Sequence, residues 1–586
     1  MRISEVKDRK KLMDAAMGRI PCDLTVKNVQ FVNVLTGEIY PAEVDILDGV
    51  TVRVREEGQE APLPSKNTYD GQGRYMTPGY IDSHMHVEST MLIPSQVARA
   101  IVPWGTTTIC TDPHEIANVM GVDGVRFMLE DGKRTALRHY VLAPSCIPAV
   151  PELECAGASF GAKEVGEILD LPGVVGVAEM MDYMGVVNHS QRMEEIAEEG
   201  RKRGLMLQGH APLATGGLLA AYRIAGPLSD HESCSAQEVR DKMRSGMHVN
   251  IRSSSIIGYL DEQMQGIKGM TNLEMASVCT DDVHVGDLLS KGHVNHIVNL
   301  MIAGGMEPVQ AIRLATINAA REYGFNDLGA IAPGYAADFQ LVDKLDGGRP
   351  YAVFIRGELA AQQGAYVAEI AGETPALPNT MHPGSVKAPE DFLLRVGEDR
   401  TSARVLVIER TGHGLYRTGK WMELPVRNGC VSLDEHPELQ FICVVNRHGT
   451  GGHTIGVTRD FGLTDGALAT TVSHDSHNFT VVYRDIHSAF ACYETLCGVG
   501  GGMCVARDGK CFETLPLPVA GLMSTMPCEE LSPRIEKVEH AMQSLCVKPF
   551  SLLNLAVYTL PVIPGMLITD RGIVDGTCQK FVEAIQ

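Results

Sequence analysis

The sequence has no run of 18 or more apolar residues, and its first segment, MRISEVKDRKKLMDAAMGR, is charged and lacks an apolar core. A membrane-spanning helix needs about 20 mainly apolar residues, and a secretory signal needs a central apolar stretch. The sequence therefore predicts neither a membrane span nor a signal peptide, which favours a cytoplasmic protein.

Paired cysteine motifs are also lacking. The 15 cysteines are scattered along the chain without a CxxC pair, and their number is odd. In a chain of this length, such cysteines are typical of reduced, mostly buried thiols in a cytoplasm. We therefore expect no cysteine-based zinc site.

Positive charge is in deficit, since 51 Lys and Arg residues stand against 72 Asp and Glu residues, a formal net charge of −21. Such a surface repels phosphates, which argues against nucleic acid as a partner. The negative net charge does not argue against a small neutral molecule as substrate.

What is present is the composition of a globular protein, with 44% hydrophobic and 21% charged residues. At 586 residues the chain predicts two or three domains. Residues 1–20 indicate a polar helix, and residues 23–75 indicate short antiparallel strands. From 76 to 330, short apolar runs alternate with helical patterns, which is typical of βα units around a parallel sheet.

Eight strand candidates in this region predict a (β/α)8 barrel. They are 79–83, 107–111, 140–144, 174–178, 205–208, 228–229, 247–251 and 276–280. Polar residues follow at least six of these runs, and barrel enzymes place their functional groups at such strand ends. These residues are His84, His86, Asp112, Glu179, His210, His231, Asp281 and Asp282.

His84 and His86 are two residues apart, so on a strand both imidazoles point to the same side, into the barrel mouth. Imidazole is a common metal ligand. The pair alone fits two turn histidines equally well. The other strand ends add two histidines and two carboxylates, His210, His231, Glu179 and Asp281. Together these residues favour a binuclear metal site bridged by Glu179.

The segment after the second strand candidate has two interpretations. Asp112, His114 and Glu115 either hold the site histidines in place or begin a helix with Pro113 in its first turn. The two are compatible, and we favour the site role. His293 and His296 are three apart, which predicts one helix face near the barrel mouth or at an interface rather than a third metal site.

Two C-terminal segments invite other interpretations. The cluster HDSH at 474–477 is not taken as a catalytic triad, because adjacent residues on one strand rarely face one another. We interpret it as a contributor to the active-site rim or to a second metal-binding patch. The stretch GVGGG at 498–502 is not a phosphate-binding loop, since no GK[ST] follows it.

Several segments resemble the adenine deaminase family of the amidohydrolase superfamily, over nearly the whole chain and in the same order. The run TPGYIDSHMHVEST (77–90) is similar to the superfamily signature. The segments that resemble the narrower family are DPHEIANVMG (112–121), GVAEMMDYMGVV (176–187), GHAP (209–212), SDHES (229–233), CTDD (279–282), GHVNHIV (292–298), 314–343, TVSHDSHNFTVV (471–482) and LPLPVAGLMS (515–524).

The resemblance implies an α/β fold, with a TIM-like (β/α)8 barrel at 76–332 and a β-sandwich built from 1–75 and 333–385. It also implies an additional C-terminal α+β domain at 386–586. The implied metal ligands are His84, His86, Glu179, His210, His231 and Asp281. They would hold two divalent ions, manganese or iron, with zinc as an alternative. A homo-oligomer, dimer or larger, is expected.

The expected reaction converts adenine to hypoxanthine and ammonia, as in purine salvage. Two divalent ions make hydroxide available at neutral pH, and it attacks C6 of the purine. Asp281 takes the hydroxide proton and passes it towards the leaving amine. Glu179 is the first candidate to protonate a ring nitrogen, and His231 the second.

Two loops depart from the family pattern. The sequence has DYM at 182–184 where the family has Asn-Phe-Pro or Asn-Tyr-Pro, and RSSS at 252–255 where the family has Arg-Glu-Gly-Ser. Both loops are expected to face the substrate, so Asp182, Arg252 and Ser253, together with Asp282, are candidate substrate-binding residues. Adenine is the leading substrate, and another aminopurine or amino-heterocycle is the alternative.

Two more distant alternatives remain. A cyclic-amide hydrolase of the dihydropyrimidinase type usually bridges its metals with a carbamylated Lys, and Glu179 stands in that place here. A metal-free scaffold paralogue normally loses ligands, and every candidate ligand is present.

Overall fold

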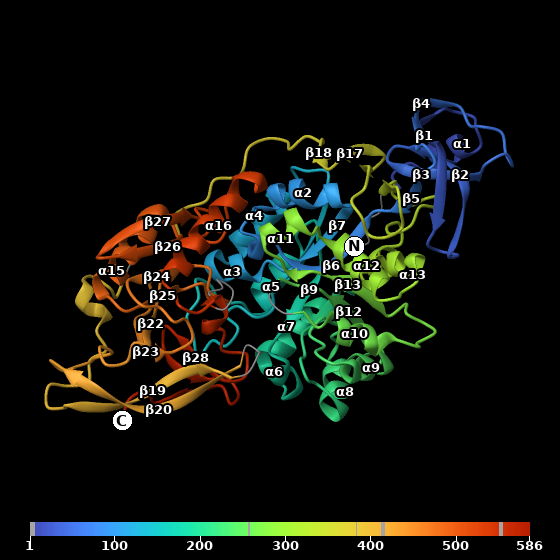
Figure 1. Ribbon diagram of the computed structural model, residues 1–586. Coiled ribbons are helices and arrows are strands. Elements are labelled where there is room, and N and C mark those ends of the chain that lie inside the picture. The colour runs from blue at the N-terminus through green and yellow to red at the C-terminus, as the bar shows by residue number, and fades with distance from the viewer. Residues whose placement is uncertain (1–5, 256–257, 383, 412–415, 550–554) are drawn as a thin grey trace.

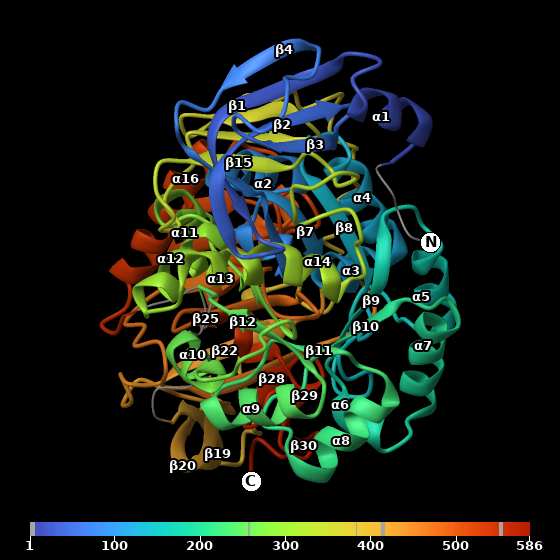
Figure 2. The ribbon, with the colours of Figure 1, turned by 90° about the vertical axis from the view of Figure 1, so that its right-hand side faces the viewer.

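The computed structural model describes residues 6–255, 258–382, 384–411, 416–549 and 555–586. A central barrel lies between a sheet of N-terminal strands on one side and a C-terminal domain on the other (Figure 1). A view turned by 90° shows the same arrangement, with the N-terminal sheet above the barrel (Figure 2). Among the described residues, no helix is long and apolar enough to cross a bilayer.

Eight strands form the barrel, and each overlaps a segment predicted from the sequence. They are β6 (Tyr80–His86), β7 (Thr106–Thr111), β8 (Arg138–Ala143), β9 (Val174–Met180), β10 (Met206–Gly209), β11 (Ser229–Asp230), β12 (His248–Arg252) and β13 (Ala276–Cys279). All their pairings are parallel, in the orders β10-β9-β8-β7-β6 and β11-β12-β13, and the short β14 (Asp281–Asp282) pairs with β6. The barrel strands are almost entirely buried, because helices cover them. The predicted barrel is confirmed.

Helices follow the barrel strands and form the outer layer. They are α2 (Pro94–Ile101), α3 (His114–Met120), α4 (Val122–Gly132), α5 (Ala162–Leu169), α6 (Tyr183–Val187), α7 (Gln191–Lys202), α8 (Gly216–Ala225), α9 (Ala236–Arg244), α10 (Leu260–Ile267), α11 (Val285–Ser290), α12 (Val294–Ala303), α13 (Pro308–Arg313) and α14 (Ala319–Glu322).

The chain segments that precede and follow the barrel in the sequence form one nine-stranded sheet together. Its strands are β1 (Cys22–Asn33), β2 (Glu38–Leu47), β3 (Val50–Glu56), β4 (Ser65–Asp70), β5 (Tyr75–Pro78), β15 (Phe339–Val342), β16 (Ala352–Ile355), β17 (Glu358–Gln362) and β18 (Ala365–Tyr366), preceded by α1 (Arg9–Ala16). The antiparallel pair β5–β15 joins the two flanks. The sheet folds over on itself like a sandwich, since Val44 and Ile46 of β2 share an apolar core with Phe339 and Phe354.

The C-terminal domain mixes a second nine-stranded sheet with two long helices. Its sheet has the order β21-β20-β19-β23-β22-β25-β24-β26-β27. The strands are β19 (Ser402–Arg410), β20 (Arg417–Arg427), β21 (Cys430–Val431), β22 (Gln440–Val445), β23 (His453–Thr458), β24 (Ala467–Thr470), β25 (Phe479–Tyr483), β26 (Gly502–Arg507) and β27 (Lys510–Pro516). The helices are α15 (Ile486–Val499) and α16 (Cys528–Ser544), and a small sheet follows with β28 (Met566–Thr569), β29 (Gly572–Asp575) and β30 (Lys580–Val582).

The C-terminal domain packs directly on the barrel. The amide of Ile93 donates to the carbonyl of Ser524, and Asn478 donates its side-chain amide to the carbonyl of Cys155 at 2.9 Å. Apolar residues of both parts, such as Ile101 of α2 and Leu522, belong to one buried core. The loop between β24 and β25, which carries His474, is thereby held against the barrel.

The glycine-rich stretch at 498–502 ends a helix. Gly500 has φ +85° and caps α15, and Gly501 and Gly502 also have positive φ. A Cβ on Gly502 would lie 2.0 Å from the carbonyl oxygen of Leu515 on the neighbouring strand. These glycines are therefore required by a tight helix-to-strand turn.

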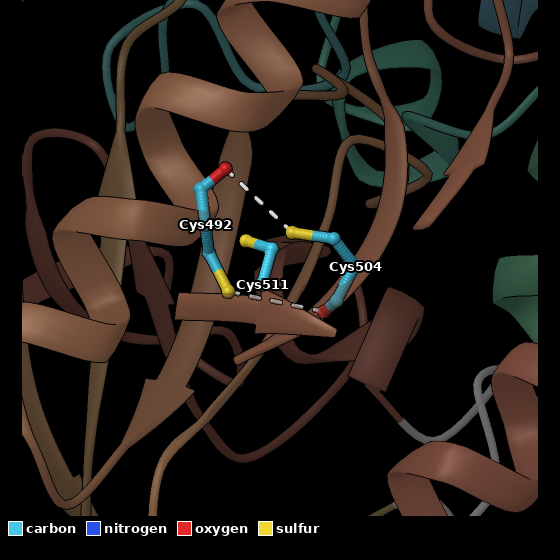
Figure 3. Close-up of side chains that lie close together, drawn as sticks. All are labelled: Cys492, Cys504 and Cys511. Atoms are coloured by element: carbon cyan, nitrogen blue, oxygen red, sulfur yellow. Dashed lines mark hydrogen bonds between the residues drawn. The ribbon is translucent and has the colours of Figure 1, made fainter. Parts of the chain in front are cut away.

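Three cysteines of the C-terminal domain lie close together, which the sequence did not predict (Figure 3). Cys492 and Cys504 each donate a thiol proton to the other's backbone carbonyl, at 3.9 and 3.6 Å. Cys511 donates to the carbonyl of Ala491 at 3.3 Å. Burial raises the pKa of the Cys492 and Cys504 thiols well above the usual value. Hydrogen bonds from Cys492 and Cys504 lower the pKa of Cys511 to about 3, so the trio consists of two protonated thiols and one more acidic thiol, packed between a helix and two strands.

Candidate metal centre and active site

Strand β6 carries two imidazoles, His84 and His86, and the Nδ1 atom of each ring makes a hydrogen bond to an oxygen acceptor. Nδ1 of His84 lies 2.9 Å from Oε1 of Gln208, and Nδ1 of His86 lies 3.0 Å from the carbonyl oxygen of Asp112. Gln208 donates its own amide group to the carbonyl of Ser83, which orients its oxygen towards His84. Because oxygen acceptors face both Nδ1 atoms, those atoms act as donors, and the two Nε2 atoms are left to face the centre of the site.

The two Nε2 atoms face one another at 3.1 Å. Oδ1 of Asp281 lies 3.5 Å from Nε2 of His84 and 3.2 Å from Nε2 of His86, and Oε1 of Glu179 lies 3.4 Å from Nε2 of His86. Two imidazole nitrogens and two carboxylates, all buried, converge on this space. Such a set of acceptors repels itself unless a cation lies among them, so the residues fit a metal ion.

A second group of donors surrounds the other oxygen of Glu179. Oε2 lies 2.5 Å from Nδ1 of His210 and 3.2 Å from Nε2 of His231. The ring of His231 stacks on that of His84 with centroids 4.1 Å apart. Glu179 therefore stands between two groups that could each hold a metal ion. The structure brings all six predicted ligands together in one place.

The charge on Asp281 is set by its neighbours. Burial alone would raise the pKa of this carboxyl group. The Arg252 guanidinium, whose Nη1 lies 2.6 Å from Oδ2, acts together with His84, His86 and His231 to hold the pKa well below its usual range. Arg252 also pairs with Glu232, whose side chain lines the same cavity. Arg252, predicted as a substrate-binding residue, thus orients Asp281.

A cluster of buried charged residues holds the segments that carry His210 and His231. Nζ of Lys242 lies 2.6 Å from Oδ1 of Asp230 and 2.7 Å from Oε1 of Glu238, with all three side chains buried. Oδ2 of Asp230 accepts the amide proton of Ala211. Asp230 therefore ties the loop that carries His210 to the strand that leads into His231.

Replacing Lys242 by methionine is expected to lower the free energy of unfolding by about 3 to 5 kcal/mol, because two buried carboxylates lose their partner. The expected result is a lower urea midpoint and weaker metal retention. The control is Lys268→Met, the same substitution at an exposed lysine that follows the next helix, α10. Equal midpoints for the two variants would contradict the prediction.

Both interpretations of the segment 112–115 hold in part. Helix α3 starts at His114, but Pro113 precedes the first turn and Asp112 makes no capping hydrogen bond among the described residues. Nδ1 of His114 lies 3.2 Å from Oδ2 of Asp112 and 3.7 Å from Oε1 of Glu179. His114 therefore joins the metal centre more closely than predicted, whereas Glu115 points towards the C-terminal domain.

A cavity of about 170 Å³ opens above the metal centre. One wall comes from the barrel and includes Glu179, Asp281 and Asp282. The opposite wall comes from the C-terminal domain and is mainly apolar, with a polar pair at one edge. Its members are Tyr416, His474, Asp475, Val557, Leu560, Val562, Ile563 and Pro564. A flat, small molecule with a polar rim fits such a space.

Two predicted substrate-facing residues lie elsewhere. Within the described residues, the cavity wall includes Met181 and Ser254 but neither Asp182 nor Ser253. The carboxylate of Asp182 accepts the amide proton of Gly185 at 2.8 Å and caps helix α6. Neither of these two side chains lines the cavity, because the loops turn the neighbouring residue inwards, and their part in substrate binding stays a prediction.

The interpretation of His293 also needs correction. His293 precedes α12 as its N-cap, so it does not share a helix face with His296. Its Nε2 lies 3.1 Å from Oδ2 of Asp82, and its Nδ1 lies 2.9 Å from the hydroxyl of Thr106. Asp82 in turn accepts a hydrogen bond from Thr280. His293 thus helps to close the barrel between β6 and β13, and its partners are structural.

The predicted C-terminal cluster reaches the site. His474 and Asp475 line the cavity, while His477 lies behind them against Glu115. Glu232, Gln208 and the apolar wall were not predicted. Glu232 follows His231 directly, so its place at a strand end was the available signal.

Known protein families cover most of the chain. Residues 75–360 match the amidohydrolase family, and residues 415–580 match the adenine deaminase C-terminal domain. The first match spans the barrel and the second spans most of the domain that supplies the opposite cavity wall.

Curated relatives match this chain over nearly its whole length. The chain is 38% identical over 580 residues to adenine deaminase 2 of Carboxydothermus hydrogenoformans, covering 97% of this chain and 98% of the relative. It is 36% identical over 598 residues to adenine deaminase of Moorella thermoacetica, covering 98% of each. A dihydropyrimidinase structure from Brevibacillus agri aligns with a TM-score of 0.45 at 15% identity, over 60% of this chain and 99% of that one.

Proposed function

Because the chain belongs to the adenine deaminase family, we propose that it hydrolyses adenine to hypoxanthine and ammonia, in the manner of a cytoplasmic purine-salvage enzyme. The observation that carries the proposal is the convergence of Nε2 of His84 and Nε2 of His86, 3.1 Å apart, with the carboxylates of Glu179 and Asp281. This cation-demanding arrangement lies at the floor of a cavity that suits one small heterocycle.

Two divalent ions, manganese or iron with zinc as the alternative, are assigned to this chain. His84, His86, Glu179, His210, His231 and Asp281 would hold them. The groups with ligand atoms close enough for one ion include His84, His231 and Asp281, and also Glu179, His210 and His231. When bound, such ions lower the pKa of water and so provide hydroxide near neutral pH.

Asp281 and Glu179 take the proton-transfer roles. Oδ1 of Asp281 faces the metal centre while Arg252 holds Oδ2, and we assign this oriented carboxylate the acceptance of the proton and its return to the leaving amine. Glu179, and after it His231, are the candidates to protonate a ring nitrogen of the purine.

The alternatives differ in chemistry. Another aminopurine would use the same residues, with selectivity set by Met181, Ser254 and the apolar wall. A cyclic-amide hydrolase usually needs a carbamylated lysine where Glu179 stands, and a metal-free scaffold does not need the six converging ligands. We further propose a homo-oligomer, and functional units at 1–75, 76–332, 333–385 and 386–586.

The test is an ammonia-release screen over aminopurines and aminopyrimidines, with the protein loaded separately with manganese, iron and zinc. Adenine is expected to give the highest kcat/KM. Hydrolysis of a cyclic amide with no ammonia from any amino-heterocycle would overturn the proposal. Size-exclusion chromatography with light scattering tests the homo-oligomer.

A further inference from the structure

Three buried side chains form a second cluster beside the cavity. Glu115 comes from α3 of the barrel, and His474 and His477 come from the loop that precedes β25 of the C-terminal domain. Nδ1 of His474 lies 3.0 Å from Oε1 of Glu115, and Nε2 of His477 lies 3.6 Å from Oε2 of Glu115. Glu115 therefore stands between the two histidines, and the cluster spans the contact between barrel and C-terminal domain.

A backbone hydrogen bond shows which nitrogen of the His477 ring carries its proton. The amide of Ser473 donates to Nδ1 of His477 at 3.1 Å, so the proton of this imidazole is on Nε2 and faces Glu115. A metal ion at this Nε2 is therefore disfavoured. Glu115 accepts a hydrogen bond from Nδ1 of His474, whereas Nε2 of His477, at 3.6 Å, is a close electrostatic neighbour and not a hydrogen-bond donor. The charges of His474 and His477 hold the pKa of Glu115 below its usual value despite burial.

His474 is left with one free ring nitrogen. Its Nδ1–H is used by Glu115, and Nε2 makes no hydrogen bond to any residue in the described part of the chain. His474 lines the same cavity as Glu179 and Asp281 of the metal centre, but it comes from the C-terminal domain. Other charged groups near it are Asp475, with Oδ1 3.7 Å from Nδ1, and Asp282.

The charge state makes this nitrogen a donor. Burial lowers the pKa of His474. The charge and the hydrogen bond of Glu115 act in the opposite direction, and the net result is a pKa raised to about 9. At neutral pH the ring is then protonated, and Nε2–H, which Glu115 does not use, belongs to a side chain that lines the cavity. Purine ring nitrogens without hydrogen are acceptors, and a hydrogen bond from a charged donor is stronger than one from a neutral donor.

We propose that His474 is a substrate-binding residue whose Nε2–H donates to a ring nitrogen of the heterocycle, and that Glu115 and His477 position it. The inference rests on the proposed function and deepens it. It assigns the C-terminal domain a direct part in recognition. The two walls then divide the work, since the barrel supplies the hydrolytic groups and the C-terminal loop holds the ring.

The test removes one partner at a time. The KM of adenine, and the inhibition constants of 1-, 3- and 7-deazaadenine against adenine deamination, each analogue lacking one ring nitrogen, are measured as the affinities of wild type and of His474→Ala. In wild type, one analogue is expected to bind about ten- to a hundredfold more weakly than adenine. In His474→Ala, adenine binds as weakly as that analogue, and the difference between the two disappears. A purely structural role would weaken all four ligands by the same factor, and that result would overturn the proposal.

Further variants keep the test decisive. Glu115→Gln is expected to weaken adenine binding with the same analogue dependence, and His474→Gln, which retains an N–H donor, to restore part of the affinity. His487→Ala, at an exposed histidine in the same domain, is the control. If His474→Ala does not fold, Glu115→Gln and His474→Gln answer the same question. Wild type that neither binds nor deaminates adenine overturns both proposals, whereas an active wild type with equal factors for all analogues overturns only the role of His474.

Discussion

Replacing Asp281 by asparagine is expected to lower kcat about 10²- to 10⁴-fold, which is the range for losing a general base. The amide cannot accept the proton, although its oxygen can still face the metal centre. Asp281 has φ +59°, and asparagine is among the residues that tolerate this left-handed conformation, so the backbone is not strained. Most of the bound metal should remain, as measured by atomic emission alongside steady-state kinetics.

A matched control exists for this substitution. Asp508 also has a positive φ, +51°, in the exposed turn between β26 and β27. Asp508→Asn therefore repeats the same chemical change in the same backbone conformation, and its kcat should equal that of wild type. A kcat for Asp281→Asn within tenfold of wild type, with full metal content, would show that another group accepts the proton.

Replacing Glu179 by glutamine is expected to have the larger effect on metal content. One carboxylate lies within 4.0 Å of imidazole nitrogens of His84, His86, His210 and His231. The substitution removes its charge and points an amide group at one of the two ligand groups. Metal content should fall below two ions per chain, and kcat/KM should fall at least about 10³-fold, since each 1.36 kcal/mol is a factor of ten.

Glu154→Gln is the control for this second prediction. Glu154 is as deeply buried, and burial together with the charge of Asp475 raises its pKa to about 8. Its carboxyl group is therefore mostly protonated at pH 7, and glutamine replaces a neutral group of the same shape. Metal content should stay at the wild-type level. A Glu179→Gln protein that retains two ions per chain would show that Glu179 is not shared between the ions.

The barrel could be predicted because its signals are local. Each strand is a short apolar run, and the alternation with helical segments repeats eight times. The histidines of β6 follow the period of two, which places both rings on the inner side. Residues directly after a buried strand have little freedom in direction, so Glu179 and Asp281 could also be placed at the barrel mouth.

Side-chain direction in loops could not be predicted in the same way. Asp182 and Ser253 were expected to face the substrate, but the cavity is lined by their neighbours Met181 and Ser254. One residue of loop rotation decides which side chain enters the cavity, and no periodicity constrains it. His293 was assigned to a helix face for a similar reason, since a spacing of three does not show where a helix starts.

The sequence by itself determined the class of chemistry, because six metal-binding side chains at successive strand ends depend only on strand order and spacing. Only the tertiary structure decided that His474 and His477 both lie against the carboxylate of Glu115. Glu115 precedes His474 by 359 positions in the chain. Packing between two domains creates that contact, and no local pattern encodes it. The same packing supplies the second wall of the cavity, and with it the candidate determinants of substrate choice.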